Sequence, residues 1–306
     1  MTPIEVQKYI DSLKDNVLEI DLSNKNLIKL PDLSRFTQLR KLYCNWNRLT
    51  SLPEKLPDSL QELYCYENQL TSLPTHLPKS LQKLDCYMNQ LTSLPPNLPH
   101  SLQKLDCENN RLTSLPDTLP NSLLVLYCNN NQLTSLPPTL PSSLLLLYCH
   151  HNQLTSLPNL PNSLQELFCS NNQLTSLPNL PNSLKILNCF NNQLTSLPDH
   201  LPNSLETLNC FNNQLTFLPY LPDSLNTLCC NGNPELEKLY PLINDYTCYF
   251  NEKQKYVNLV NQRLIRKKME KINLNGCLIE KAIQFRMRPE RMAWYLDQGY
   301  ELDDIS

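Results

Sequence analysis

Apolar and polar positions recur along most of this chain with a period of 20 or 21 residues. In one cycle, residues 60–74 read LQELYCYENQLTSLP, and a second Leu-Pro pair follows two residues later. Residues 61–65 alternate between polar and apolar character, and this period of two predicts a short β-strand. Leu63 and Cys65 would then face inward and Tyr64 outward. Each cycle therefore predicts one strand with a buried and an exposed side.

A cysteine stands at the same place in ten consecutive cycles, three residues before an asparagine. The ten positions are Cys44, Cys65, Cys86, Cys107, Cys128, Cys149, Cys169, Cys189, Cys210 and Cys230. An eleventh, degenerate cycle precedes them, with Ile20 and Leu22 inward and Lys25 in place of the asparagine. Stacked cycles predict one long parallel sheet, and the polar departure of the first cycle is typical of a terminal, capping repeat.

Each cycle also carries signals for its turns. The asparagine, as at Asn47, Asn68 and Asn89, would end the strand and bond through its amide to backbone groups of its own turn and of the adjacent coil. The stretch that follows, residues 70–78 in one cycle, is too short and too rich in proline for a helix, since proline fixes φ and removes an amide donor. We expect it to run extended or polyproline-like along the opposite side of the coil.

The phrase LxxLxLxxNxL, with cysteine in place of the third leucine, resembles the motif of the leucine-rich repeat family over about residues 17 to 233. The longer phrase LPxxLPxSLxxLxxxxNQLTSLP resembles the short repeats of enterobacterial type III effectors, a family of secreted ubiquitin ligases and their ligase-free relatives. The resemblance implies an α/β repeat solenoid: a horseshoe with a concave parallel β-sheet, an extended convex side and small helical caps at both ends. Those ligases add a large helical catalytic domain, whereas about seventy residues follow the last repeat here, so ligase activity is not carried over.

A second resemblance rests on composition and on one short segment. The chain is rich in asparagine and poor in glycine, and residues 289–300 read PERMAWYLDQGY. These features resemble leucine-rich repeat proteins of amoeba-infecting giant viruses. Either source would imply a protein that meets host proteins.

The ends of the chain depart from the repeat. We predict an N-terminal capping helix over residues 1–16, the solenoid of about eleven cycles over 17–233, and a C-terminal helical cap or tail over 234–306. Thr2 and Pro3 suit the N-cap and the first helical position. A cap at each end would cover a stacked core that is otherwise open.

The tail predicts two or three helices between about residues 252 and 298. Its apolar helical stripe consists of Val257, Val260, Leu264, Ile265, Met269 and Ile272. Residues 251–271 hold seven basic and two acidic side chains, which fits either a cap helix with a solvated basic face or a site for nucleic acid or anionic lipid. Aromatic residues for base stacking are missing from the basic face and acidic residues follow, so nucleic acid is disfavoured.

Composition bears on the compartment. No apolar run approaches the roughly 18 residues of a membrane span, and the first residues lack a basic start followed by an apolar stretch. One cysteine per repeat is unlike the irregular disulfide framework of a small secreted protein, and there is no Asn-x-Ser/Thr sequon. We expect a soluble, intracellular protein of the cytoplasm, including the cytoplasm of a host cell.

Residue types that carry chemistry do not converge on a catalytic pattern. The cysteine ladder fits small buried side chains better than a metal or redox array, because no CxxC pair accompanies it. Cys229 occupies an outward position and is the expected reactive thiol, while Cys248 and Cys277 receive no catalytic role. The pair His150-His151 fits a solvated turn, with a metal or pH-sensing role as the alternative. We therefore expect no enzyme activity, no cofactor and no metal.

The outward side chains of the strands are unusually aromatic, which is either a binding face or a simple preference of aromatic residues for strands. The expected partner-binding residues are Tyr43, Tyr64, Tyr66, Tyr87, Val125, Tyr127, Leu146, Tyr148, Phe168, Ile186, Phe190 and Phe211. The charged residues Lys83, Asp85, Lys104 and Asp106 interrupt this face, and we expect them to form cross-strand pairs on a solvated surface.

The sequence thus predicts a monomeric, non-enzymatic scaffold that recognises a protein partner, including a host protein, through its concave face. Three alternatives remain open. The tail could recruit ubiquitin machinery, the chain could be a structural component of a particle that self-associates, or the tail could act as a vestigial ligase through a cysteine. The identity of the partner does not follow from the sequence.

Overall fold

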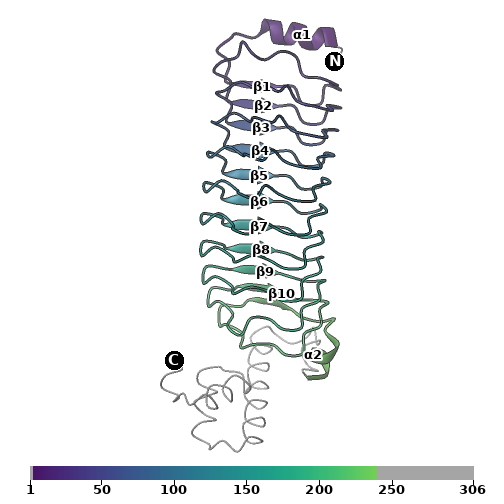
Figure 1. Cartoon of the computed structure of the whole chain (residues 1–306), viewed down its shortest axis with the longest axis vertical. Coiled ribbons are helices and arrows are strands. Elements are labelled where there is room, and N and C mark those ends of the chain that lie inside the picture. Colours follow the sequence, from purple (N-terminus) through teal and green to yellow (C-terminus); the bar gives the residue numbers. More distant parts are fainter. Residues whose placement is uncertain (1–2, 240–306) are drawn as a thin grey trace, which may run out of the picture.

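The chain folds as a solenoid of stacked coils, each with one short strand and irregular connections (Figure 1). A computed structural model describes residues 3–239 of the 306-residue chain. The predicted tail helices, Cys248 and Cys277 lie outside the described residues.

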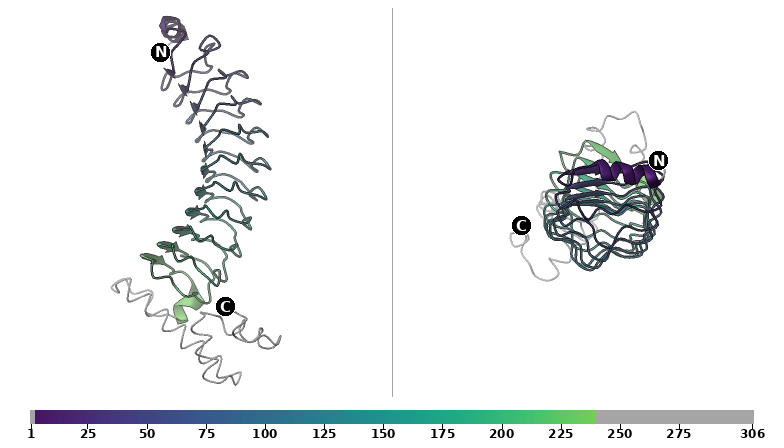
Figure 2. Two further views of the ribbon diagram at one scale, coloured as in Figure 1. Left: turned by 90° about the vertical axis from the view of Figure 1, so that its left-hand side faces the viewer. Right: turned by 90° about the horizontal axis from the view of Figure 1, so that it is seen from above.

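Eleven strands of three residues each form the sheet. They are β1 (Glu19–Asp21), β2 (Lys41–Tyr43), β3 (Glu62–Tyr64), β4 (Lys83–Asp85), β5 (Lys104–Asp106), β6 (Val125–Tyr127), β7 (Leu146–Tyr148), β8 (Glu166–Phe168), β9 (Ile186–Asn188), β10 (Thr207–Asn209) and β11 (Thr227–Cys229). Their spatial order is their chain order, and every pair is parallel. The predicted repeat solenoid with a parallel sheet is confirmed. The strands line the inner, concave edge of a curved arc (Figure 2).

The register aligns equivalent residues of successive cycles. Leu63 pairs with Leu42 on one side and Leu84 on the other, and Tyr64 lies between Tyr43 and Asp85. Strands of one sheet are about 4.8 Å apart, so each side chain of a cycle touches its counterpart in the next. A column of equivalent positions is therefore a continuous strip of surface or core.

Leucine and cysteine fill the interior of every coil. In the cycle of β3, the side chains of Leu60, Leu63, Cys65 and Leu70 have no exposed surface. Burying a leucine side chain contributes roughly 1.5–3 kcal/mol. Because the same four positions are buried in every cycle from β2 to β10, the core is one uninterrupted column along these coils.

The asparagine ladder predicted from the sequence is present. Asn68 donates through Nδ2 to the carbonyl oxygens of Cys44 in the preceding coil and of Cys65 in its own, at 3.0 and 3.1 Å. Its Oδ1 accepts from the backbone N–H of Leu49 in the preceding coil, at 3.0 Å. The same pattern recurs at Asn89, Asn110 and beyond. Each asparagine therefore joins two coils through backbone groups that would otherwise be unsatisfied.

A second ladder, of serines, was not anticipated from the sequence. The Oγ of Ser80 lies 2.7 Å from the carbonyl oxygen of Leu60 in the preceding coil, and it recurs in the phrase PxSL of each cycle. The serines are Ser59, Ser80, Ser101, Ser122, Ser143, Ser163, Ser183, Ser204 and Ser224. The coils are thus tied together at both ends of the strand.

The proline-rich connections carry no helix within the described part of the solenoid, and their only bridge joins His200 to Tyr220. Proline fixes φ and has no backbone N–H to donate. Proline-rich segments on the convex side therefore need few hydrogen-bond acceptors. The extended convex side predicted from the sequence is confirmed.

Both described ends of the solenoid carry a helix. Helix α1 (Pro3–Ser12) buries Val6 and Ile10 against the first coil, and Arg35 fixes its end by donating to the carbonyl oxygen of Ile10 at 2.6 Å and to Asp15 at 2.6 Å. The short helix α2 (Pro234–Leu239) follows the last coil. A helix thus lies where the N-terminal cap is predicted, while the division of the chain into three units stays a prediction. Within residues 3–239, neither helix has the length and apolar character needed to cross a bilayer.

Candidate functional site

The inner surface of the arc presents three columns of side chains. The first column is the first residue of each strand from β2 to β11: Lys41, Glu62, Lys83, Lys104, Val125, Leu146, Glu166, Ile186, Thr207 and Thr227. The second column is the third residue of each of these strands: Tyr43, Tyr64, Asp85, Asp106, Tyr127, Tyr148, Phe168, Asn188, Asn209 and Cys229. The third column follows the buried cysteine: Asn45, Tyr66, Tyr87, Glu108, Asn129, His150, Ser170, Phe190, Phe211 and Asn231. All twelve residues predicted to bind a partner lie in these columns.

The N-terminal aromatic cluster consists of Tyr43, Trp46, Tyr64, Tyr66 and Tyr87. The rings of Tyr43 and Tyr64 stack with centroids 4.7 Å apart, and those of Tyr66 and Tyr87 with centroids 4.6 Å apart. Trp46 meets Tyr66 edge to face at 5.6 Å. Such pairs contribute about 0.5–1.5 kcal/mol each beyond their buried area. Each stacked pair covers one face of each of its rings, so stacking leaves the ring edges, the opposite faces and the hydroxyl groups for other contacts.

Charged residues hold this cluster in place. The hydroxyl of Tyr64 donates to Glu62 at 2.6 Å, and Glu62 lies 3.4 Å from the ammonium of Lys41 and 3.5 Å from that of Lys83. Burial, and then the hydrogen bond to Glu62, raise the pKa of the Tyr64 hydroxyl. Tyr64 therefore stays a neutral hydrogen-bond donor across the physiological pH range.

An acidic cluster, made of Asp85, Asp106 and Glu108, follows along the columns. Asp106 is only 7% exposed, and burial together with the neighbouring Asp85 raises its pKa to about 7. Burial also raises the pKa of Asp85 to about 6. The nearest cation is Lys104, whose Nζ lies 3.6 Å from Asp106 on the same strand.

The expectation of cross-strand pairs on a solvated surface is therefore wrong for part of this group. Lys83 does pair across strands, with Glu62, but Lys104 pairs within its own strand and Asp106 is buried. Asp85 lies beside Tyr64 of the preceding cycle and Asp106 beside Tyr127 of the next one, and a sequence pattern does not reveal how much water such neighbours exclude.

The central aromatic cluster consists of Tyr127, Tyr148, Phe168 and His150. The ring centroids of Tyr127 and Tyr148 are 4.8 Å apart, and those of Tyr148 and Phe168 are 4.3 Å apart. These rings are tilted by 55° and 36°, unlike the parallel rings of the N-terminal aromatic cluster. The hydroxyl of Tyr148 donates to Glu166 at 2.7 Å. Tilted rings leave part of each ring face open, which suits contact with an apolar side chain.

Beyond this cluster the aromatic residues are more isolated. Ile186 and Phe190 are half-buried, whereas Phe211 is 41% exposed. Asn188 and Asn209 occupy the second column here. The C-terminal third of the face thus offers single apolar side chains among amides.

Sequence reasoning missed Trp46 and Met88, which are 49% and 48% exposed. Both stand directly before a ladder asparagine, at a position that has a positive φ in every cycle, here 54° and 50°. Asparagine and glycine tolerate this left-handed conformation, whereas other residues are strained in it. Most later cycles place asparagine there, as at Asn109 and Asn130. Aligning the cycles at this position would have singled out the two large apolar side chains.

The ten ladder cysteines lie in the core. All are buried and none is in a disulfide. Burial raises the pKa of Cys44 and of Cys149 to about 12, so their reactive thiolate forms are scarce near neutral pH. The thiols of Cys86 and Cys107 each lie 3.3 Å from a carbonyl oxygen of the next coil. Cys229, on the inner face, is half-exposed.

The histidines do not form a metal site. His150 is half-buried, and burial lowers its pKa. His151 is exposed, and its Nε2 lies 3.2 Å from Nδ2 of Asn171. Among residues 3–239 there is no group of three or more His, Cys, Asp or Glu side chains that could hold a metal ion.

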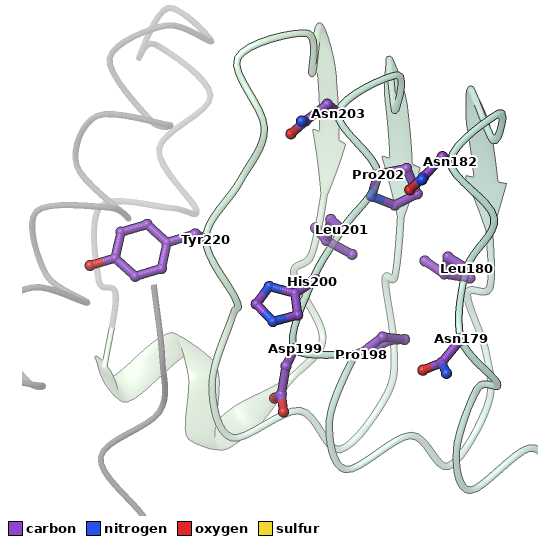
Figure 3. Close-up of a pocket in the computed structure, with 10 residues that line it drawn as sticks. All are labelled: Asn179, Leu180, Asn182, Pro198, Asp199, His200, Leu201, Pro202, Asn203 and Tyr220. Atoms are coloured by element: carbon purple, nitrogen blue, oxygen red, sulfur yellow. The ribbon is translucent and has the colours of Figure 1, made fainter. Parts of the chain in front are cut away.

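Hollows on the outer part of the coil are a feature of the repeat. One, of about 570 Å³, lies between the connections around His200 and Tyr220 (Figure 3). Two others occupy equivalent places, one beside Thr118 and Thr139 and one beside His76. Because equivalent hollows recur at three places between neighbouring proline-rich connections, none of them stands out as a specific small-molecule site.

Comparisons with known proteins agree with this geometry. The family model for leucine-rich repeats in two copies matches residues 79–121 and 162–203. No curated protein matches the chain.

Three solved structures are similar over most of the solenoid. YopM from Yersinia enterocolitica WA-314 is 41% identical over 73% of this chain and 48% of its own, with a TM-score of 0.69. YopM from Yersinia pestis, a leucine-rich effector protein, is 42% identical over 71% of this chain and 61% of its own, with a TM-score of 0.66. The functional domain of InlJ from Listeria monocytogenes, which includes a cysteine ladder, is 26% identical over 71% of this chain and 54% of its own, with a TM-score of 0.60. This chain spans about half to three fifths of the length of these structures.

Proposed function

We propose that this chain, which belongs to the leucine-rich repeat family, is a non-enzymatic recognition scaffold that binds a protein partner through its inner face. The observation that carries the proposal is the pair of aromatic clusters on that face. The core does not need these side chains, because leucine and cysteine fill it completely. Half-exposed tyrosine and phenylalanine are favoured at protein interfaces, since they bury a large area with few rotatable bonds.

The comparisons support the same class of protein. Two of the similar structures are YopM proteins of Yersinia, and the one from Yersinia pestis is described as a leucine-rich effector protein. An effector acts on the proteins of another cell. By this likeness the partner of the present chain is a host protein, met in the cytoplasm of the host cell.

The thiols support the same compartment. Ten buried cysteines, spaced one coil apart and free of disulfides, suit a reducing environment. In this proposal the scaffold acts as a monomer, and the partner occupies the concave side of the arc.

The experiment is a pull-down from host-cell lysate that compares the intact protein with a variant carrying Tyr127→Ser, Tyr148→Ser and Phe168→Ser. A control variant changes three exposed residues of the convex side in the cycles of β5 to β7, Thr113, Thr134 and Thr155, to serine. We expect a captured protein to be lost with the first variant and kept with the second, with both variants folded by circular dichroism. Identical captures from all three proteins would refute the assignment of the inner face.

A further inference from the structure

The acidic cluster lies between the two aromatic clusters without a gap. In the second column, Asp85 is next to Tyr64, and Asp106 is next to Tyr127. In the third column, Glu108 lies between Tyr87 and Asn129. Three carboxylates therefore occupy a stretch of the inner face, here called the notch, with Tyr64 and Tyr87 on one side and Tyr127 and Asn129 on the other.

Cations within the chain balance this notch only in part. Lys83 is directed to Glu62, at 3.5 Å, on the side of the N-terminal aromatic cluster. Among residues 3–239, Lys104 is the one cation that forms an ion pair in the notch, with its Nζ 3.6 Å from Asp106 and 5.1 Å from the ring centroid of Tyr127. This lysine shows what the notch accepts: a cation held between a carboxylate and the face of a tyrosine.

Unsatisfied acceptors point the same way. Asn129 is only 3% exposed, and its Nδ2 donates to Glu108 at 2.8 Å, which holds the amide against the acidic cluster. The Oδ1 of Asn129 and the Oδ1 of Asp85 are buried, and neither has a hydrogen-bond partner among the described residues. Both atoms are oxygen acceptors, so a ligand that reaches them must supply N–H or O–H donors.

A guanidinium group meets all of these requirements. It is always charged, carries five N–H donors in a planar fork, and stacks on aromatic faces. An ammonium is a poorer match, because it is a strongly hydrated point charge and Lys104 already supplies one. Burial raises the pKa of Asp106 to about 7, and a bound cation would offset this cost of ionisation.

We infer that the notch formed by Asp85, Asp106, Glu108 and Asn129 receives an arginine side chain of the protein partner, with apolar partner residues on either side contacting the two aromatic clusters. The inference rests on the proposed function and specifies the partner's chemistry at that face. Charge complementarity would fix the orientation of the partner along the arc.

The test uses the full-length protein and a random twelve-residue peptide display library. Peptides that bind are synthesised with arginine, with lysine, or with citrulline, which keeps the shape of arginine and removes its charge. Each is measured against the intact protein and against the variant Asp85→Asn, Asp106→Asn. A control variant, Asp58→Asn with Asp117→Asn, removes two exposed carboxylates from outside the inner face. Unfolding curves verify that every variant is folded.

We expect selected peptides to be enriched in arginine, and citrulline or the Asp85/Asp106 variant to weaken binding by about tenfold or more, since both remove a desolvated charge pair. Lysine should rescue part of the affinity and the control variant should change nothing. Peptides that lose affinity for the Tyr127/Tyr148/Phe168 serine variant but show no arginine dependence would overturn the inference and leave the proposed function standing. Peptides indifferent to that serine variant, or no selected peptide at all, would count against both.

Discussion

At the residue scale, some cycles place a residue other than asparagine or glycine at a backbone position that favours these two. The residue before each ladder asparagine has a positive φ, and five of the cycles with a cysteine place asparagine there. Trp46 and Met88 instead put large apolar side chains at this strained position, and both are exposed. Backbone strain at an exposed apolar residue motivates the proposal that these two side chains contact a partner.

Removal of the backbone strain at Met88 should stabilise the folded protein. Met88→Asn should raise the free energy of unfolding by about 0.5–1 kcal/mol, because asparagine adopts the left-handed conformation at lower cost. Chemical denaturation measures the change. The reverse replacement, Asn130→Met, is the matched control and should lower stability by a similar amount. A loss of stability in Met88→Asn would show that packing of the methionine outweighs its backbone strain.

Asp106 makes stability depend on pH in a direction opposite to most carboxylates. Its pKa is raised from 3.8 to about 7 in the folded protein, chiefly by burial, so the folded state favours the protonated form. Stability from this group should therefore fall as pH rises from about 4 through 7, at no more than about 1.4 kcal/mol per pH unit. Asp85, with its pKa raised to about 6, acts in the same direction.

The check is a set of denaturation curves between pH 5 and pH 8 for the intact protein and for Asp106→Asn, in which the buried charge is absent. The variant should be less sensitive to pH and more stable than the intact protein near pH 8. Parallel curves for the two proteins would mean that Asp106 keeps an ordinary pKa.

At the scale of the element, the sequence predicted the strands well because their pattern depends on the strand alone. The alternation around Leu63 and Cys65 specifies which side chains enter the core, and the asparagine ladder follows from one amide per turn. The serine ladder was missed because each serine bonds to a backbone carbonyl, as Ser80 does to that of Leu60. Every residue carries a backbone carbonyl, so the sequence does not mark the acceptor. The burial of Asp106 was missed because its cause lies in neighbouring coils. Which face of the sheet binds a partner stays a prediction.

The asparagine ladder predicts a large local cost for losing one amide. Asn131 bonds to the carbonyl oxygens of Cys107 and Cys128 and to the N–H of Leu112. Asn131→Ala would leave these buried groups without partners, at about 1–3 kcal/mol for each, so we expect a total loss of at least about 3 kcal/mol. The neighbouring, exposed Gln132→Ala should change stability by less than about 0.5 kcal/mol. Similar values for the two variants in denaturant titrations would contradict a structural role for the ladder.

The cysteine column predicts two classes of thiol. With Cys248 and Cys277 replaced by serine, a thiol reagent should label Cys229 quickly in the native protein and the ten ladder cysteines slowly, because burial keeps them protonated and out of reach. Mass spectrometry after short exposure identifies the labelled sites. In denaturant all eleven should react, which controls for the reagent. Fast labelling of most ladder cysteines in the native state would rule out the buried column.

At the scale of the whole molecule, each coil contacts only its neighbours, so stability is close to a sum over cycles and interfaces. Removal of residues 132–152 joins Asn131 to Gln153 and preserves the phrase of the repeat. We expect this shortened protein to fold cooperatively, with a modestly lower melting temperature, because β6 and β8 present the same core residues to each other. It should lose partner binding, since the deletion removes Tyr148 and His150. Aggregation or loss of the β-signal in circular dichroism would show that the coils are not interchangeable.

The regular register of the inner face also acts as a ruler. Side chains of one column recur about every 4.8 Å, the spacing between strands, whereas successive turns of an α-helix recur every 5.4 Å. A helix laid along the arc would slip by about 0.6 Å at each coil and would be half a turn out of step after about four or five coils. The turns of the helix and the strands of the arc therefore stay aligned over only a few coils. A helical partner can therefore match one aromatic cluster and the notch beside it. A partner that contacts the whole arc must instead present side chains that repeat at the distance between neighbouring strands, about 4.8 Å.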